Sequence, residues 1–233
     1  MLTKGQILVA AHEPARKRRG TLLPPRPPRF DGTSTLVPDG GFVDEGSYSD
    51  LALAGNVLLE QSARNITVER AAFQRVRLAG SRFPGAHFRD CAFEACDLAQ
   101  LTMDRGSGLR VALRECRLLG FHAAECRFNE AEFSDCTAPL ALFFGSKFKS
   151  ARFSHCVLTE ASFQETDLTG VVFHECDLRQ ANFQGATLVG AALRGSQHDG
   201  IVAGPRELQG AIVDPHQAAL LAVLLGLDVR WEE

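Results

Sequence analysis

A strict five-residue period dominates this sequence and constrains its fold more than any local propensity does. Twelve of the 16 phenylalanines lie in one register, five residues or a multiple of five apart, and leucine fills most of the remaining positions. These phenylalanines are Phe73, Phe83, Phe88, Phe93, Phe128, Phe133, Phe143, Phe148, Phe153, Phe163, Phe173 and Phe183. The register two residues earlier is small in nearly every repeat from Ala71 to Ala191. Neither a helix, with its 3.6-residue period, nor a strand, with its two-residue period, repeats every five residues, so the chain must turn a corner at that interval.

The repeating unit reads A/C-x-F/L-x-x, as in residues 161–165 and 181–185. This unit resembles the repeat of the pentapeptide-repeat family, and the likeness runs over residues 51–213. The resemblance implies an all-β solenoid, a right-handed quadrilateral β-helix in which one pentapeptide forms one face and four form a coil. We therefore expect about eight coils, stacked about 4.8 Å apart, with the large and small registers pointing inward. Each coil is buried only against its neighbours, so both ends need caps.

One stretch departs from the pattern. At Gly106 and Gly108 both inward positions are glycine, which gives that coil no side chain to pack. Glycine within a strand often marks a bulge, so we expect a bulge or a small loop there.

All seven cysteines fall in the small inward register. They are Cys91, Cys96, Cys116, Cys126, Cys136, Cys156 and Cys176, and five of them repeat every twenty residues, so they should stack into a ladder. Their spacing fits no zinc motif, and buried cysteine packs as a small hydrophobe. Free thiols fit a reducing compartment, and the apolar run at residues 7–11 is too short for a signal peptide. We expect a cytoplasmic protein.

The two ends differ in composition from the repeat. Residues 1–35 are expected to form a flexible, basic, Pro/Arg-rich arm, which could touch an acidic partner or nucleic acid, dock in an aromatic groove, or be merely solvated. Residues 36–50 are expected to cap the first coil, residues 51–213 to form the β-helix, and residues 214–233 to form a C-terminal helix and tail. Asp214-Pro215 is a typical helix start.

The C-terminal helix is apolar on nearly every side, so one side could close the solenoid while the remainder binds a second copy. Similar pentapeptide-repeat proteins often dimerise through such elements. We therefore expect a homodimer, with a monomeric cap as the alternative. The dimerisation residues would be Leu220, Leu221, Val223, Leu224 and Leu225.

Enzymatic activity has little support in the sequence. The seven histidines are scattered without a nucleophile–base pair, and no glycine-rich phosphate loop occurs. The walls of a solenoid are flat, whereas active sites need a concave pocket. We expect no catalytic residues, no cofactor-binding residues and no metal ligands. No apolar run is long enough to span a bilayer, so we also expect no membrane partner.

Partner binding is the better hypothesis. The resemblance implies a DNA mimic that binds DNA gyrase or another type II topoisomerase and modulates it or protects it from inhibitors such as antibiotics. The twenty-residue coil places Glu115, Asp135 and Glu175 in one column, and Glu125 and Glu165 in another. These five acids are the candidate partner-binding residues.

Two alternatives remain open at this point. The protein could be a rigid scaffold or adaptor for some other protein, with no topoisomerase role, and the acids could be its ordinary solvated surface. Direct nucleic-acid binding is expected only as weak phosphate contact through the basic arm, because aromatic residues for base stacking are absent outside the core.

Overall fold

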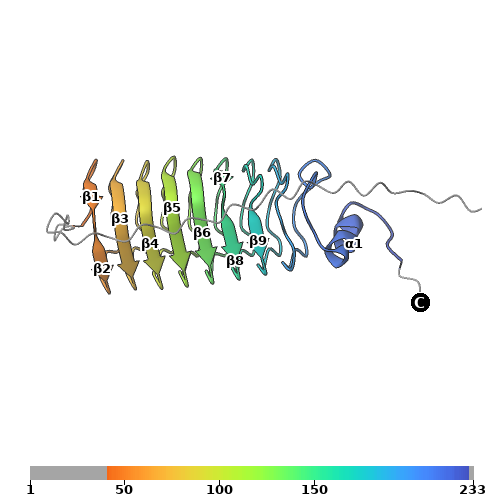
Figure 1. The fold of residues 1–233 in the computed structure, drawn as a ribbon, viewed down its shortest axis with the longest axis horizontal. Helices are drawn as coiled ribbons and strands as arrows, with labels where there is room; N and C mark the ends of the chain where they lie inside the picture. Colours follow the sequence, from red (N-terminus) through yellow and green to blue (C-terminus); the bar gives the residue numbers. More distant parts are fainter. Residues whose placement is uncertain (1–40, 231–233) are drawn as a thin grey trace, which may run out of the picture.

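The computed structural model describes residues 41–230, which form an elongated parallel β-solenoid closed at one end by a helix (Figure 1). The basic arm expected at residues 1–35, and residues 36–40 of the expected N-terminal cap, lie outside the described residues. The strands are β1 (Ser47–Ser49), β2 (Ala52–Ala54), β3 (Thr67–Gln74), β4 (His87–Glu94), β5 (Ser107–Arg114), β6 (Arg127–Ser134), β7 (Lys147–Lys149), β8 (Arg152–Ser154) and β9 (Val172–His174), followed by helix α1 (Pro215–Leu224).

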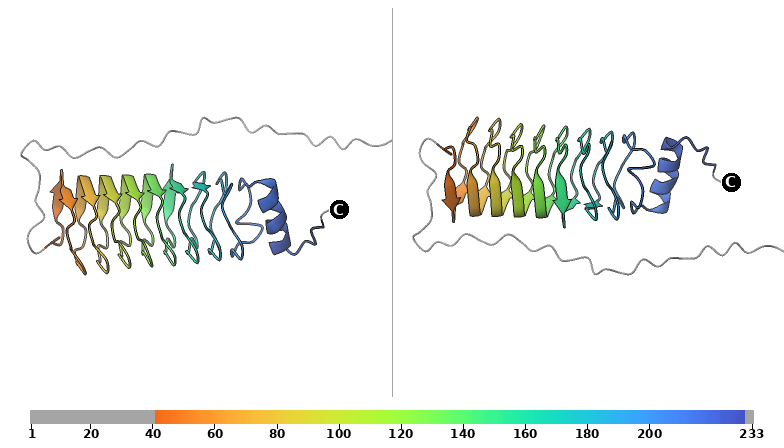
Figure 2. Two further views of the ribbon diagram at one scale, coloured as in Figure 1. Left: turned by 90° about the horizontal axis from the view of Figure 1, so that it is seen from below. Right: turned by 90° about the horizontal axis from the view of Figure 1, so that it is seen from above.

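Every strand pairs in parallel with the segment twenty residues further along the chain. The sheet runs in the order β1-β3-β4-β5-β6-β8-β9, with β2 beside β3 and β7 beside β6. Isolated bridges at the same interval hold the other two walls, and they continue to Ala192 and Ile212. The regular strands cover about six turns, fewer than the eight coils expected, because the later rungs are joined by single bridges. Figure 2 shows the successive rungs from two sides.

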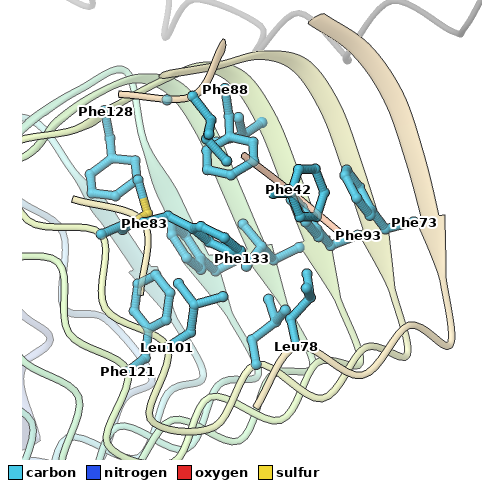
Figure 3. A pocket seen from close by; sticks show the side chains of 16 residues that line it. Phe42, Phe73, Leu78, Phe83, Phe88, Phe93, Leu101, Phe121, Phe128 and Phe133 are labelled. Atoms are coloured by element: carbon cyan, nitrogen blue, oxygen red, sulfur yellow. The ribbon is translucent and has the colours of Figure 1, made fainter. Parts of the chain in front are cut away.

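The phenylalanine register forms the core. The rings of Phe73 and Phe93 stack at 4.5 Å, as do those of Phe133 and Phe153, and Phe153 also stacks on Phe173 at 5.1 Å. Edge-to-face contacts join these columns across the interior, so each ring gains both area burial and favourable aromatic geometry. Figure 3 shows Phe73, Phe93 and Phe133 among the side chains that project inward around a narrow apolar space. The prediction that the large register points inward is confirmed.

The bulge expected at Gly106 and Gly108 is wrong. Strand β5 runs through this segment without interruption, and Gly108 pairs in register with Phe88 on one side and Phe128 on the other. A Cβ atom at Gly108 would lie 2.9 Å from Cδ1 of Phe128 and 3.0 Å from Cγ2 of Val111, because these two side chains already fill the space. The place of the missing side chain is taken in part by Phe128 of the next coil, a contact that the sequence pattern within one coil does not reveal.

Helix α1 closes the C-terminal end. Asp214 and Gln217 form a capping box, and the Gln217 side chain is buried with 3% exposure. Its Nε2 donates to the carbonyls of Leu193 and Ser196, both at 2.7 Å, so Gln217 fastens the helix to the last complete coil. Among residues 41–230, no helix has the length and apolarity needed to cross a membrane.

Candidate partner-binding surface

The corners of the solenoid lie at residue numbers divisible by five, and their backbones are left-handed. In the described part of the chain, 22 non-glycine corner residues have φ between 50° and 59°. Eleven of them are acidic: Glu45, Asp50, Glu60, Asp90, Glu115, Glu125, Glu130, Asp135, Glu160, Glu165 and Glu175. This conformation costs a non-glycine residue about 1–2 kcal/mol, with aspartate and asparagine better tolerated than glutamate. The frequent glutamates therefore bring a charged side chain to the corner at a conformational cost.

The first candidate surface is the Glu115 edge, the corner column made of Glu115, Asp135, His155 and Glu175. All four side chains are exposed. The amides of Glu115 and Asp135 donate to the carbonyls of the next coil at 3.0 Å, which fixes the corner backbone. Within residues 41–230, Glu115 and Asp135 form no ion pair, whereas Glu175 contacts His155 and His174. The structure thus brings the three predicted acids together on one straight edge.

The second candidate surface is the Glu125 edge, which carries Glu125, Gly145, Glu165 and Gly185 in one column. Both glutamates are exposed, but a glycine separates them, so they lie two coils apart. Ten residues, half a coil, separate this column from the Glu115 edge, which places the two at diagonally opposite corners. The five predicted acids therefore belong to two separate surfaces, and one flat partner can cover only one of them.

In a third corner column, the charged side chains pair with one another between coils. Asp50, Arg70, Asp90, Arg110 and Glu130 alternate in sign along one edge. Arg110 binds Asp90 through two hydrogen bonds, of 2.6 and 2.8 Å, and Arg70 binds Asp50 in the same way. The side-chain hydrogen bond to Asp90 raises the pKa of Arg110 above its ordinary value.

The sequence analysis did not identify this column as an ion-pair ladder, although charges that alternate in sign every twenty residues indicate one. Asp50 and Asp90 are each only 3% exposed, so the ladder is an internal part of the fold. The Glu115 edge has no such alternation: Glu115 and Asp135 stand in adjacent coils with the same sign.

Cys91 and Cys126 offer no reactive group to this surface. All seven cysteines are free and buried, and Cys96 Sγ, for example, donates to the Phe73 carbonyl at 3.3 Å. Burial raises the pKa of Cys91 to about 12 and that of Cys126 to about 12, which keeps both thiols protonated at neutral pH. A thiol in that state is a poor nucleophile and a poor metal ligand. The interpretation of the cysteines as packing residues agrees with these contacts.

The interior hollow offers no binding site either. It has a volume of about 40 Å³ and is lined by apolar residues, among them Phe73, Met103 and Phe133 (Figure 3). A cavity of this size and lining holds at most a water-sized occupant and has no polar group to orient it. A partner-binding site would therefore have to lie on the outer surface.

The predicted dimerisation residues divide between two roles. Leu221 is 8% exposed and packs into the core, so it belongs to the cap and is not available to a second copy. The other four are exposed: Leu220, Val223, Leu224 and Leu225. The sequence could not separate them, because the helix is apolar all round and shows no preferred side.

Comparison with known proteins identifies the repeat. Residues 107–183 match the family model described as a pentapeptide repeat region. No curated protein sequence gives a significant match.

Among solved structures, full-length QnrB1, a plasmid-mediated fluoroquinolone resistance protein, is 23% identical with a TM-score of 0.43, covering 78% of this chain and 100% of its own. HetL, a pentapeptide repeat protein involved in heterocyst differentiation regulation from the cyanobacterium Nostoc sp. strain PCC 7120, is 21% identical with a TM-score of 0.31, covering 70% of this chain and 89% of its own. The five-residue corners continue without a break on both sides of the matched region. The chain thus contains a pentapeptide repeat region.

Proposed function

We propose that this protein is a non-enzymatic rod that binds another protein through the Glu115 edge, at a partner surface that otherwise accepts a DNA backbone. The candidate partner is a type II topoisomerase such as DNA gyrase, whose activity or inhibitor sensitivity the rod would modulate. One observation supports this most: exposed acids stand at rigid left-handed corners in successive coils, unpaired at Glu115 and Asp135 within the described residues.

The spacing of the edge supports a partial imitation of DNA. Stacked rings of successive coils lie 4.5 to 5.2 Å apart, so acids in one column repeat at about that distance. A DNA strand carries one negative charge per about 3.4 Å of helix axis. The edge thus has the sign and the straightness of a phosphate backbone at a lower charge density. It would occupy part of a basic DNA-binding groove.

Rigidity favours binding through this edge. The corner amides are hydrogen-bonded to the next coil, so few backbone degrees of freedom remain to be lost when a partner docks. Exposed charge of one sign also accelerates encounter with a basic surface and makes the association rate sensitive to salt.

A DNA supercoiling assay with purified gyrase tests this proposal. The intact protein is expected to alter supercoiling, or to preserve it in the presence of a fluoroquinolone, and Glu115→Lys with Asp135→Lys is expected to abolish the effect. The proposal fails if the intact protein neither changes supercoiling, nor protects it, nor binds the enzyme.

We also propose that the exposed side of α1 joins two copies into a homodimer. Val223 and Leu224 are 57% and 43% exposed, and this apolar surface continues through Leu220 and Leu225. Val223→Arg with Leu224→Arg should convert a dimer to a monomer in light scattering without lowering the melting temperature. A monomeric wild-type protein at micromolar concentration would refute this. Leu221→Arg is unsuitable for the test, because it would disrupt the cap.

A scaffold for a different protein is the second candidate function, and one corner favours it. Leu140 has φ of 58° and is 55% exposed, an unfavourable backbone for an apolar side chain that packs against little. Pro139 and the 36%-exposed Val157 lie on the adjoining wall. If the scaffold hypothesis holds, Leu140→Gly will leave stability unchanged or higher but weaken partner capture. The Glu115-edge variant will then have no effect on that capture.

A further inference from the structure

Two histidines and a glutamate from different coils meet on the Glu115 edge. Nδ1 of His155 lies 3.3 Å from Oε2 of Glu175, and Nε2 of His174 lies 3.7 Å from Oε1 of the same carboxylate. The two imidazole rings have their centroids 5.5 Å apart. One nitrogen from each ring and one carboxylate oxygen all lie within 4.8 Å of one another. All three side chains are about half exposed, so an ion could reach them from solvent.

The solenoid positions these three side chains through its backbone. Strands β8 and β9 pair in register, with Ser154 opposite His174, and each strand ends one residue before a corner. His155 and Glu175 occupy those two corners with φ of 52° and 50°. The amide of His155 also donates to the carbonyl of His174 at 2.9 Å. The distance between the two coils is therefore fixed, and only side-chain rotations are needed to adjust the three groups.

The donor set matches a particular class of ion. Zn²⁺ binds imidazole nitrogen and carboxylate oxygen at about 2.0–2.2 Å, so two ligands of a tetrahedral site lie about 3.3 Å apart. The pair distances of 3.3 and 3.7 Å to Glu175 are close to that value. Mg²⁺ and Ca²⁺ prefer oxygen ligands, whereas imidazole favours Zn²⁺ and its transition-metal neighbours.

We propose that His155, His174 and Glu175 bind one Zn²⁺ on the outer edge of the solenoid, with the remaining coordination position open to water. The site differs from the sequence expectation of no metal ligands. The site shares His155 and Glu175 with the Glu115 edge but uses neither Glu115 nor Asp135, which are the residues changed to test the topoisomerase proposal, so the two proposals can fail separately. The spacing of these residues in the sequence is consistent with such a site, because His155 and Glu175 are one coil apart and His174 directly precedes Glu175.

Zn²⁺ titration of the untagged full-length protein by calorimetry at pH 7.5 tests the site. The expected result is one Zn²⁺ per chain, with no binding of Mg²⁺ or Ca²⁺ at the same concentration. His155→Asn, His174→Ala and Glu175→Gln should each weaken Zn²⁺ binding by at least about tenfold, since loss of even an outer-shell partner of a metal site costs about 10- to 100-fold. Asparagine is chosen at the first position because it tolerates the left-handed corner.

Two variants serve as matched controls. Glu160→Gln changes another corner glutamate, with φ of 56°, and His87→Ala changes another histidine, which contacts Ser107 at 2.8 Å. Both should bind Zn²⁺ as the wild type does. Zn²⁺ should also raise the melting temperature of the wild type and of both controls but not that of the three ligand variants.

The proposal is overturned if the wild type binds no Zn²⁺, or if any one of the three ligand variants binds it with unchanged affinity. It is also overturned if a control variant loses affinity as strongly as the ligand variants do. Circular dichroism of each variant establishes that a loss of binding is not a loss of fold.

Discussion

Gln217 is the residue through which the C-terminal cap can be tested most sharply. Its side chain is buried between α1 and the last coil, where Nε2 donates to the carbonyls of Leu193 and Ser196 at 2.7 Å each. Its Oε1 accepts a hydrogen bond from the amide of Asp214 at 3.0 Å, which forms one half of the capping box. Gln217→Ala removes all three hydrogen bonds while keeping the helical propensity of the position high.

The magnitude follows from the two hydrogen bonds of Nε2. A typical intramolecular hydrogen bond contributes about 0.5–1.5 kcal/mol, so the pair accounts for about 1–3 kcal/mol of cap stability. We expect a value in the upper half of this range, because the two carbonyls would lose their donor at a buried position that water hardly reaches. Gln197→Ala, an exposed glutamine one coil earlier, is the matched control and should change stability by less than about 0.5 kcal/mol.

Hydrogen exchange measures the effect where it arises. Each coil is stabilised mainly by its neighbours, so loosening of the cap should fray the last coil before the rest of the solenoid unfolds. Amides of residues 191–213 should exchange about 5- to 150-fold faster in Gln217→Ala, which is the factor that 1–3 kcal/mol corresponds to. Amides of β3 to β6 should be unchanged. Equal protection of the last coil in the variant and the wild type would show that the helix is not fastened by this side chain.

Three further predictions concern the core, the ion-pair ladder and pH. Gly108→Leu restores the leucine register but should destabilise the protein by about 1–3 kcal/mol in urea unfolding, because the Cβ alone meets Phe128 at 2.9 Å; a gain in stability would contradict this. Asp90→Ala leaves the largely buried Arg110 without its bidentate partner and should lower the free energy of unfolding by about 3–5 kcal/mol. Asp97→Ala breaks an exposed pair and should lower it by under about 1 kcal/mol. Similar losses of stability in both variants would refute a structural role for the ion-pair ladder. Backbone hydrogen bonds, chiefly from the amide of Gln217, lower the pKa of Asp214 in the folded protein. The ionised carboxylate therefore stabilises the cap fully above the ordinary carboxyl pKa, and this stabilisation is lost as the pH falls through the pKa of the folded protein. Protection of the last coil should therefore decline below about pH 4, and a decline confined to neutral pH would contradict the assignment.

The repeat, the inward registers and the buried cysteines could be predicted from the sequence because all of them depend only on the spacing of residues along the chain. Phe153 and Cys96 face inward for the same reason: every fifth residue occupies an equivalent place in a coil. The acids of the Glu115 edge could also be placed on one column by counting in twenties.

The remaining features depend on contacts between coils, which counting within a coil does not show. Gly108 was expected to weaken its strand, but the ring of Phe128 from the next coil and the side chain of Val111 fill its place. The Asp90–Arg110 pair and the His155–Glu175 contact join residues twenty apart, and the roles of Leu221 and Gln217 depend on which side of α1 meets the last coil. Side-chain contacts of this kind follow from the three-dimensional stacking of the coils and from the packing of α1 on the last coil.

The most direct test compares the two acidic edges on one partner. Gyrase binding should be measured by surface plasmon resonance for the wild type, for Glu115→Lys with Asp135→Lys, and for Glu125→Lys with Glu165→Lys. All four are exposed left-handed corner residues, so the two variants alter equal charge in equal backbone surroundings. The proposal predicts that the first pair weakens binding at least about tenfold while the second leaves it nearly unchanged. Equal losses in both variants, or no gyrase binding by the wild type, would contradict a partner surface on the Glu115 edge.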